Sequence, residues 1–134
     1  MSLKVVTPPA TEQITLEEAR LHLRITPDDD SPPAHPDDSL VLALISAARD
    51  FCEGKLFRAI APQTLEIVLD SFPDKIQLPM SPVRGITSVK YVDENAIEQT
   101  LSSTLYVLDN DMEPGWVLPL IGTSWPATYG AINS

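Results

Sequence analysis

Residues 37–56 read DDSLVLALISAARDFCEGKL, and this stretch decides the fold of the 134-residue chain. Its apolar side chains form two rows with spacings of four, three and four, which predicts one face of an α-helix. The first row is Leu40, Leu44, Ala47 and Phe51, and the second is Val41, Ile45, Ala48 and Cys52. A face two rows wide needs more than one neighbouring helix to cover it.

The opposite face of this helix is polar, with Ser46, Arg49, Asp50 and Glu53, and Asp37 or Asp38 is expected to cap its start. Because the rest of the chain predicts one short helix, part of the apolar face needs a surface outside the chain. The expected subunit interface is Leu40, Val41, Leu44, Ile45, Ala48, Phe51 and Cys52. The lone cysteine, Cys52, is expected to be a buried small hydrophobe and not a reactive thiol.

The composition of the chain argues against some classes of binding partner. Its formal net charge is −10, spread along the sequence, and no cluster of Lys and Arg occurs. This argues against a groove that neutralises nucleic-acid phosphates. No apolar run approaches the ~20 residues of a membrane span, and the N-terminus carries no secretion signal pattern. The 13 prolines predict short elements joined by stiff loops.

The N-terminal part predicts an extended arm at residues 1–13 and a helical part at residues 14–58. Thr15 and Glu18 form a capping-box pattern that starts a short helix ending near Arg24. Residues 27–38, PDDDSPPAHPDD, predict a solvated acidic loop. Their aspartates lack the ligand spacing and the glycine of a calcium loop, and His22 and His35 have no companion at metal spacing.

The period changes from helical to two after the long helix, which predicts a β part at residues 62–122. Strands are expected at residues 64–70, 75–78, 86–92, 96–101, 105–108 and 116–118. The clearest hairpin turns at residues 93–96. An irregular tail follows at residues 123–134. The chain is therefore expected to be one α+β domain, with a helical hairpin followed by an antiparallel β unit.

No catalytic or cofactor-binding motif stands out. The sequence lacks a nucleophile elbow, a phosphate-binding glycine loop and metal-binding spacings, so no metal and no cofactor are expected. Glu94 and Glu98 form a possible carboxylate pair for an acidic hydrolase, but carboxylates at turns are usually solvated. We expect that the chain is not an enzyme.

Several segments, in this order, resemble the head-to-tail connector (adaptor) family of tailed double-stranded DNA phages and prophages. These segments are VTPPATEQITLEEARLHLRI at residues 6–25, DDSLVLALISAARDFCE at 37–53, PQTLEIVLDSFPDKIQLPMSPVRGITSVKYVDENAIEQTL at 62–101, and SWPA at 124–127. The resemblance covers nearly the whole chain, and its motifs are structural patterns.

The resemblance implies a homo-oligomeric ring under the portal protein that joins the head to the tail or to a stopper protein. DNA would pass through the ring without sequence-specific binding. The expected locations are the virion and, during assembly, the host cytoplasm. No catalysis and no cofactor are implied.

The chain departs from the family pattern in three places. Leu56-Phe57-Arg58 stands where the family commonly has a Thr-Gly-Arg turn, and the loop at residues 31–36 is longer than usual. Relatives also continue past SWPATYGAINS with a strand and C-terminal helices, so the chain resembles a truncated or cleaved form. A competing hypothesis is a small module that binds a peptide by strand addition at an open sheet edge.

Overall fold

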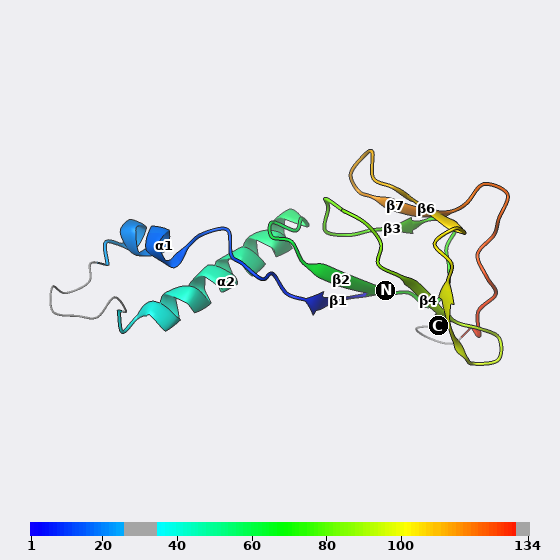
Figure 1. Cartoon of the computed structure of the whole chain (residues 1–134), viewed down its shortest axis with the longest axis horizontal. Coiled ribbons are helices and arrows are strands. Elements are labelled where there is room, and N and C mark those ends of the chain that lie inside the picture. The colour runs from blue at the N-terminus through cyan, green and yellow to red at the C-terminus, as the bar shows by residue number, and fades with distance from the viewer. Residues whose placement is uncertain (26–34, 131–134) are drawn as a thin grey trace. The chain divides into compact units, whose positions relative to one another are not determined.

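The computed structural model describes residues 1–25 and 35–130, which form two compact units (Figure 1). Unit 1 comprises Met1–Thr7 and Thr64–Ser134, and unit 2 comprises Pro8–Gln63. Both described helices belong to unit 2 and all described strands belong to unit 1. The predicted α+β class is therefore confirmed, and the first seven residues join the β part of the chain.

Helix α1, Leu16–Leu23, begins with the predicted capping box. The Thr15 hydroxyl accepts a bond from the Glu18 amide at 3.2 Å, and the Thr15 amide donates to the Glu18 carboxylate at 2.8 Å. Two donors that the first turn leaves unpaired are thus satisfied reciprocally. Arg24 ends the helix in the left-handed conformation, with φ 57°.

Helix α2, Asp38–Leu56, is the long helix that the apolar rows predict. Asp37 occupies the N-cap position, but its side chain makes no capping bond. Asp38 instead accepts a bond from the His35 amide at 2.8 Å and from Arg20 Nε at 2.7 Å. Because Arg20 belongs to α1, this half-buried ion pair joins the two helices.

Helix α2 continues through Gly54 and ends at Leu56. Phe57 then takes the left-handed conformation, with φ 51°. Glycine usually fills such a position after a helix, because an L side chain is strained there.

Strand β1, Ser2–Thr7, pairs antiparallel with β2, Thr64–Val68. The register places Lys4 opposite Glu66, and the pairing shifts between Val5 and Thr7. The extended arm expected at residues 1–13 is therefore in part a paired strand, which corrects the assignment of its first half. All six residues of β1 are exposed.

The hairpin predicted around residues 93–96 is present as β4, Val89–Val92, and β5, Glu98–Leu101. One carboxylate oxygen of Asp93 accepts bonds from the Asn95 amide at 2.9 Å and the Ile97 amide at 3.0 Å, which closes the turn. The Tyr129 amide donates to the Val92 carbonyl at 3.1 Å, so the tail attaches to the outer edge of β4.

A third sheet has the strand order β3, β7, β6, with both pairs antiparallel. Its strands are β3 (Ile76–Gln77), β6 (Tyr106–Asp109) and β7 (Trp116–Pro119). All three lie within a residue or two of the strands expected there.

The core is small. Among the described residues, the buried hydrophobic side chains are Val41, Ala61, Ile76, Leu101 and Val117. Phe72 stacks on Trp125 at 4.8 Å between ring centroids and meets Tyr91 edge-on at 6.0 Å, so Trp125 anchors the tail. Neither described helix combines the length and apolarity that a membrane crossing requires.

Candidate subunit interface on helix α2

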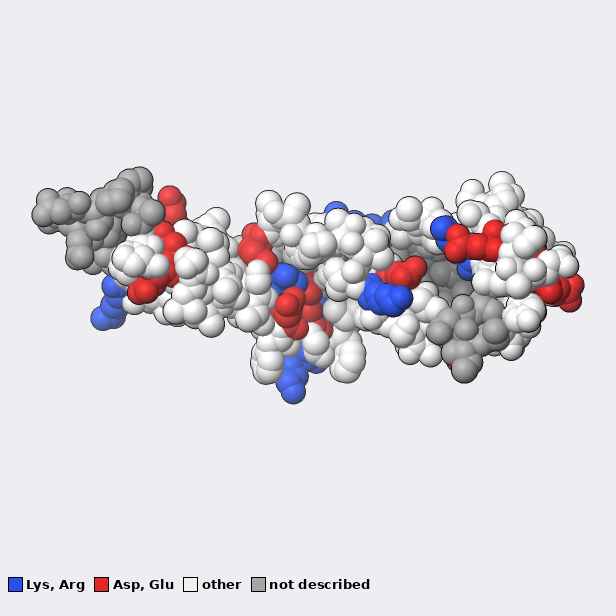
Figure 2. Space-filling view, turned by 90° about the horizontal axis from the view of Figure 1, so that it is seen from below, with Lys and Arg blue, Asp and Glu red and all other residues white. Residues whose placement is uncertain are grey.

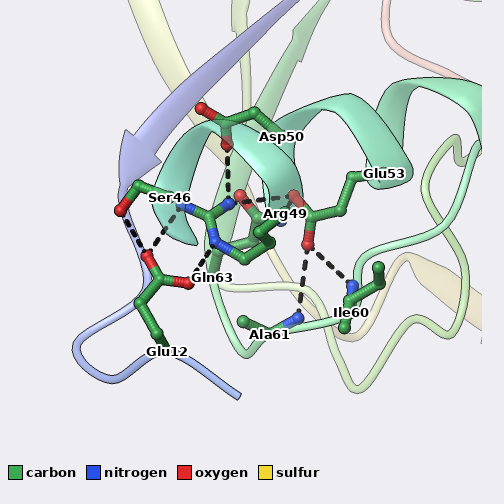
Figure 3. A network of polar contacts seen from close by, with 8 residues as sticks. All are labelled: Glu12, Ser46, Arg49, Asp50, Glu53, Ile60, Ala61 and Gln63. Atoms are coloured by element: carbon green, nitrogen blue, oxygen red, sulfur yellow. Dashed lines mark hydrogen bonds and ion pairs between the residues drawn. The ribbon is translucent and has the colours of Figure 1, made fainter. Parts of the chain in front are cut away.

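Helix α2 turns its polar face toward the rest of unit 2 and its first apolar row toward solvent. The side chains of Arg49 and Glu53 are only 12% and 6% exposed. On the opposite side, Leu44 is 55% exposed and Phe51 is 66% exposed. The periodicity identifies the two faces correctly, but it does not reveal that the polar one is covered. The polar face is covered, in place of the apolar one, because of the contacts that its side chains make (Figure 3).

Glu53 is the buried centre of these contacts. Its Oε1 accepts bonds from the Ile60 amide at 2.7 Å and the Ala61 amide at 3.2 Å. Its Oε2 accepts bonds from Gln63 Nε2 at 3.0 Å and Arg49 Nη1 at 3.1 Å. Both carboxylate oxygens are therefore satisfied, as a buried charge requires. The result is that residues 60–63 are tied to the last turns of α2.

Arg49 connects the helix to the segment that precedes α1. Its Nε donates to Glu12 Oε2 at 2.8 Å, and its Nη1 donates to Asp50 at 2.7 Å (Figure 3). The hydroxyl of Ser46 donates to the same Glu12 carboxylate at 2.7 Å. A planar guanidinium can hold several carboxylates in fixed directions, which an ammonium cannot do. One arginine therefore positions both the incoming segment and the polar face of α2.

The hydrogen bonds shift the pKa values of the carboxyl groups downward. The pKa of Glu12 lies below its ordinary value because of the bonds from Arg49 and Ser46. Burial raises the pKa of Glu53, but the bonds from Ile60, Gln63 and Ala61 and the charge of Arg49 outweigh it, so its pKa is also lowered. Both groups are therefore held in the ionised form at neutral pH.

The structure separates the seven residues of the predicted interface into two groups. Val41 is buried within its own chain and Ile45 is half-buried, so neither offers much surface to a partner. The exposed members are Leu40, Leu44, Ala48, Phe51 and Cys52. Ala47, between them, is exposed too. The exposed apolar surface thus lies mainly on the first row.

The expectation that Cys52 is buried is wrong. The cysteine is a free, exposed thiol on the C-terminal half of α2. The second row is covered at Val41 and in part at Ile45, and this cover does not extend to Cys52.

The carboxylates that could suggest a catalytic or metal site do not converge in the described part of the chain. Glu98 accepts a bond from Lys90 at 2.9 Å on the surface, and Glu94 lies exposed in the adjacent turn. No group of three or more potential metal ligands occurs among residues 1–25 and 35–130. Asp28, Asp29 and Asp30 of the acidic loop lie outside the described residues.

Charged side chains do not gather into a basic patch on the face that Figure 2 displays. Lysine and arginine atoms occur there in small groups, and acidic atoms lie beside most of them. This distribution agrees with the low basic content of the sequence.

The sequence patterns did not reveal the contacts of Arg49, Glu53, Glu12 and Gln63. Arg49 and Glu53 are four residues apart on the helix, a spacing at which opposite charges commonly interact. That spacing is enough to predict the ion pair between Arg49 and Glu53. The involvement of Glu12 and Gln63 depends on how the chain folds back, which no local pattern reveals.

Comparisons with known proteins give one family and one fold. The family model described as phage gp6-like head-tail connector protein matches residues 13–110. A chain in the neck of an empty gene transfer agent (GTA) particle, computed with C6 symmetry, is similar in fold, with a TM-score of 0.80 and 23% identity. The match covers 97% of this chain and 66% of that chain.

A chain in the virion of a native gene transfer agent particle is also similar, with a TM-score of 0.73 and 23% identity. That match covers 98% of this chain and 67% of the other. The chain thus spans about two thirds of the length of both neighbours. No curated protein matches it significantly.

Proposed function

The chain belongs to the phage gp6-like head-tail connector protein family, and from this premise we propose that identical copies of it form a ring in a phage-like particle. The ring joins the head to the tail, contacts the portal protein on one side and a tail or stopper protein on the other, and lets DNA pass. The family match over residues 13–110 is the observation that carries this proposal. The similar fold of a chain in a particle neck supports it.

The charge of the chain suits a passage for DNA. A net charge of −10 without a basic cluster repels phosphates, so the polymer is not held by the protein it passes. We infer that the lumen of the ring carries net negative charge. The role is structural and not enzymatic, in keeping with the family.

The exposed apolar residues of α2 supply surface for contact between copies. Leaving a large apolar side chain in water forgoes on the order of 1.5–3 kcal/mol of burial. Leu40, Leu44 and Phe51 are each more than half exposed, so their burial against another copy would favour association. A ring additionally requires head-to-tail contacts between different surfaces of neighbouring copies.

The test is assembly on the portal. The purified chain is mixed with portal rings from its own particle, and the product is imaged by electron microscopy. We expect an additional ring of density beneath the portal, with an open channel. Portal rings that remain bare at every protein concentration would overturn the proposal.

A further inference from the structure

The outward face of α2 carries a continuous line of small and large apolar residues. It consists of Leu40, Ala43, Leu44, Ala47, Phe51 and Gly54, and all six are exposed. None of these positions carries a charge, in a chain with a net charge of −10. Spacings of three and four along one line are those of a seam that packs against another helix. We call these six residues the α2 seam.

Helix α2 cannot cover the seam by turning about its own axis. The opposite face is fixed by the buried bonds of Glu53 to the Ile60 and Ala61 amides and by the contact of Arg49 with Glu12. Turning the helix would break these bonds and leave a buried carboxylate unpaired, which is costly. The described residues of the chain therefore leave the seam exposed.

We propose that the α2 seam binds the α2 seam of a second copy of this chain, antiparallel, about a two-fold axis beside Ala47. In this arrangement Phe51 lies opposite Ala43 of the second copy, and Leu40 lies opposite Gly54. At these two pairs a large side chain faces a small one, which lets two helices approach closely. A Cβ added at Gly54 would meet nothing within 4 Å in the single chain. The chain itself therefore leaves room there for Leu40 of the second copy.

The charges at the two ends of α2 favour the same antiparallel pairing. The N-terminal end carries the exposed carboxylate of Asp37, and the C-terminal end carries Lys55, whose ammonium lies 5.6 Å from the Phe51 ring. An antiparallel copy brings each acidic end beside a basic end, and opposed helix dipoles add to the attraction. A parallel copy would instead place like charges together at both ends.

This dimer is distinct from the proposed ring. A two-fold contact uses the same surface on both copies and closes after two, so it cannot by itself build a ring of more copies. The dimer is therefore the form expected of the free chain, away from the portal.

Disulfide trapping tests the geometry. Ala47→Cys is combined with Cys52→Ser, so that the thiol introduced at position 47 is the single one in each copy and lies at the axis. Mild oxidation should convert most of this variant to a covalent dimer. Cross-linking that is no more efficient than for the Cys52→Ser chain alone, which has no thiol, overturns the proposal.

The wild type is the matched control for this trapping. In an antiparallel pair the two Cys52 residues are about 15 Å apart along the helices, too far for a disulfide. The wild type should therefore not cross-link under the same oxidation. Efficient trapping through Cys52 would show a different pairing of the helices and would overturn the proposal.

A second pair of substitutions tests the seam in solution. Leu44 and Ile97 are 55% and 56% exposed, but only Leu44 lies on the seam. Leu44→Ser should weaken the dimer measured by sedimentation by roughly tenfold or more, and Ile97→Ser should leave it unchanged. The proposed contact through the seam is overturned if the wild type is monomeric at every concentration. It is also overturned if both substitutions weaken the dimer equally.

These experiments distinguish a failure of the dimer proposal from a failure of the proposed function. A wild type that dimerises through the seam but leaves portal rings bare would support the seam and overturn the proposed function. A monomeric wild type that still adds a ring beneath the portal would overturn the seam and support the proposed function.

Discussion

At the scale of single residues, Glu53 is the one buried charged residue in the described part of the chain. It is a buried carboxylate with four donors, which come from the helix, from the turn after it and from Gln63. Asp50 offers a comparison within the same contacts, because it pairs with the same Arg49 nitrogen but is 69% exposed. The two acids therefore separate the effect of burial from the effect of charge.

We predict that Glu53→Gln destabilises unit 2 and that Asp50→Asn does not. The amide of glutamine has one acceptor oxygen in place of two, so a buried donor loses its partner, at a cost of about 1–3 kcal/mol. An exposed ion pair contributes little, so Asp50→Asn should change the free energy of unfolding by less than about 0.5 kcal/mol. Urea unfolding followed by helical circular dichroism measures both. Equal effects would show that burial of Glu53 is unimportant.

The lowered pKa values of Glu12 and Glu53 predict the pH dependence of stability. Their folded-state pKa values lie below the ordinary carboxyl value, so the unfolded chain binds more protons as the pH falls. The stabilisation is thus present above the ordinary pKa of about 4.3 and is lost as the pH falls through the folded values. Unfolding free energies measured from neutral to acidic pH should decline in that range. Glu53→Gln should flatten the decline, and an unchanged slope would contradict this account.

At the scale of elements, the end of α2 carries a local strain. Phe57 holds a left-handed conformation with φ 51°, and its side chain is 76% exposed, so little packing compensates. The chain has phenylalanine where a helix commonly ends with glycine.

Phe57→Gly is therefore expected to stabilise unit 2 by about 0.5–1 kcal/mol, since glycine adopts this conformation without strain. Phe57→Ala is the matched control, because it removes the same ring but keeps a Cβ in the left-handed conformation. The midpoint of thermal unfolding should rise for glycine and not for alanine. A rise of equal size in both variants would point to removal of the exposed ring as the cause.

The elements also show what the sequence could and could not predict. The two helices and the hairpin at residues 93–96 follow from local periodicity and turn chemistry, and their positions are confirmed. The sequence predicts an arm in place of strand β1, because the partner β2 is far along the chain and prolines follow Thr7. The periodicity of α2 defines its faces, but which face is covered depends on Glu12 and Gln63, which lie outside the helix.

At the scale of the whole molecule, charge governs the relation to DNA. We predict no measurable binding to duplex DNA at physiological salt, because the −10 charge and the absence of a basic cluster leave no site for phosphates. A gel-shift assay with random-sequence duplex measures it. Micromolar affinity at that salt would contradict the prediction and the proposed acidic lumen together.

The division of the chain into units has a consequence for its synthesis. Strand β1 leaves the ribosome before its partner β2, which follows only after all of unit 2 has been translated. At about 5–20 residues per second, the wait is roughly 3–11 s. During that time β1, whose Leu3, Val5 and Val6 are exposed even in the folded chain, has no β2 to pair with. Strand β1 therefore waits longer for its partner than β4, whose partner β5 follows after a short turn.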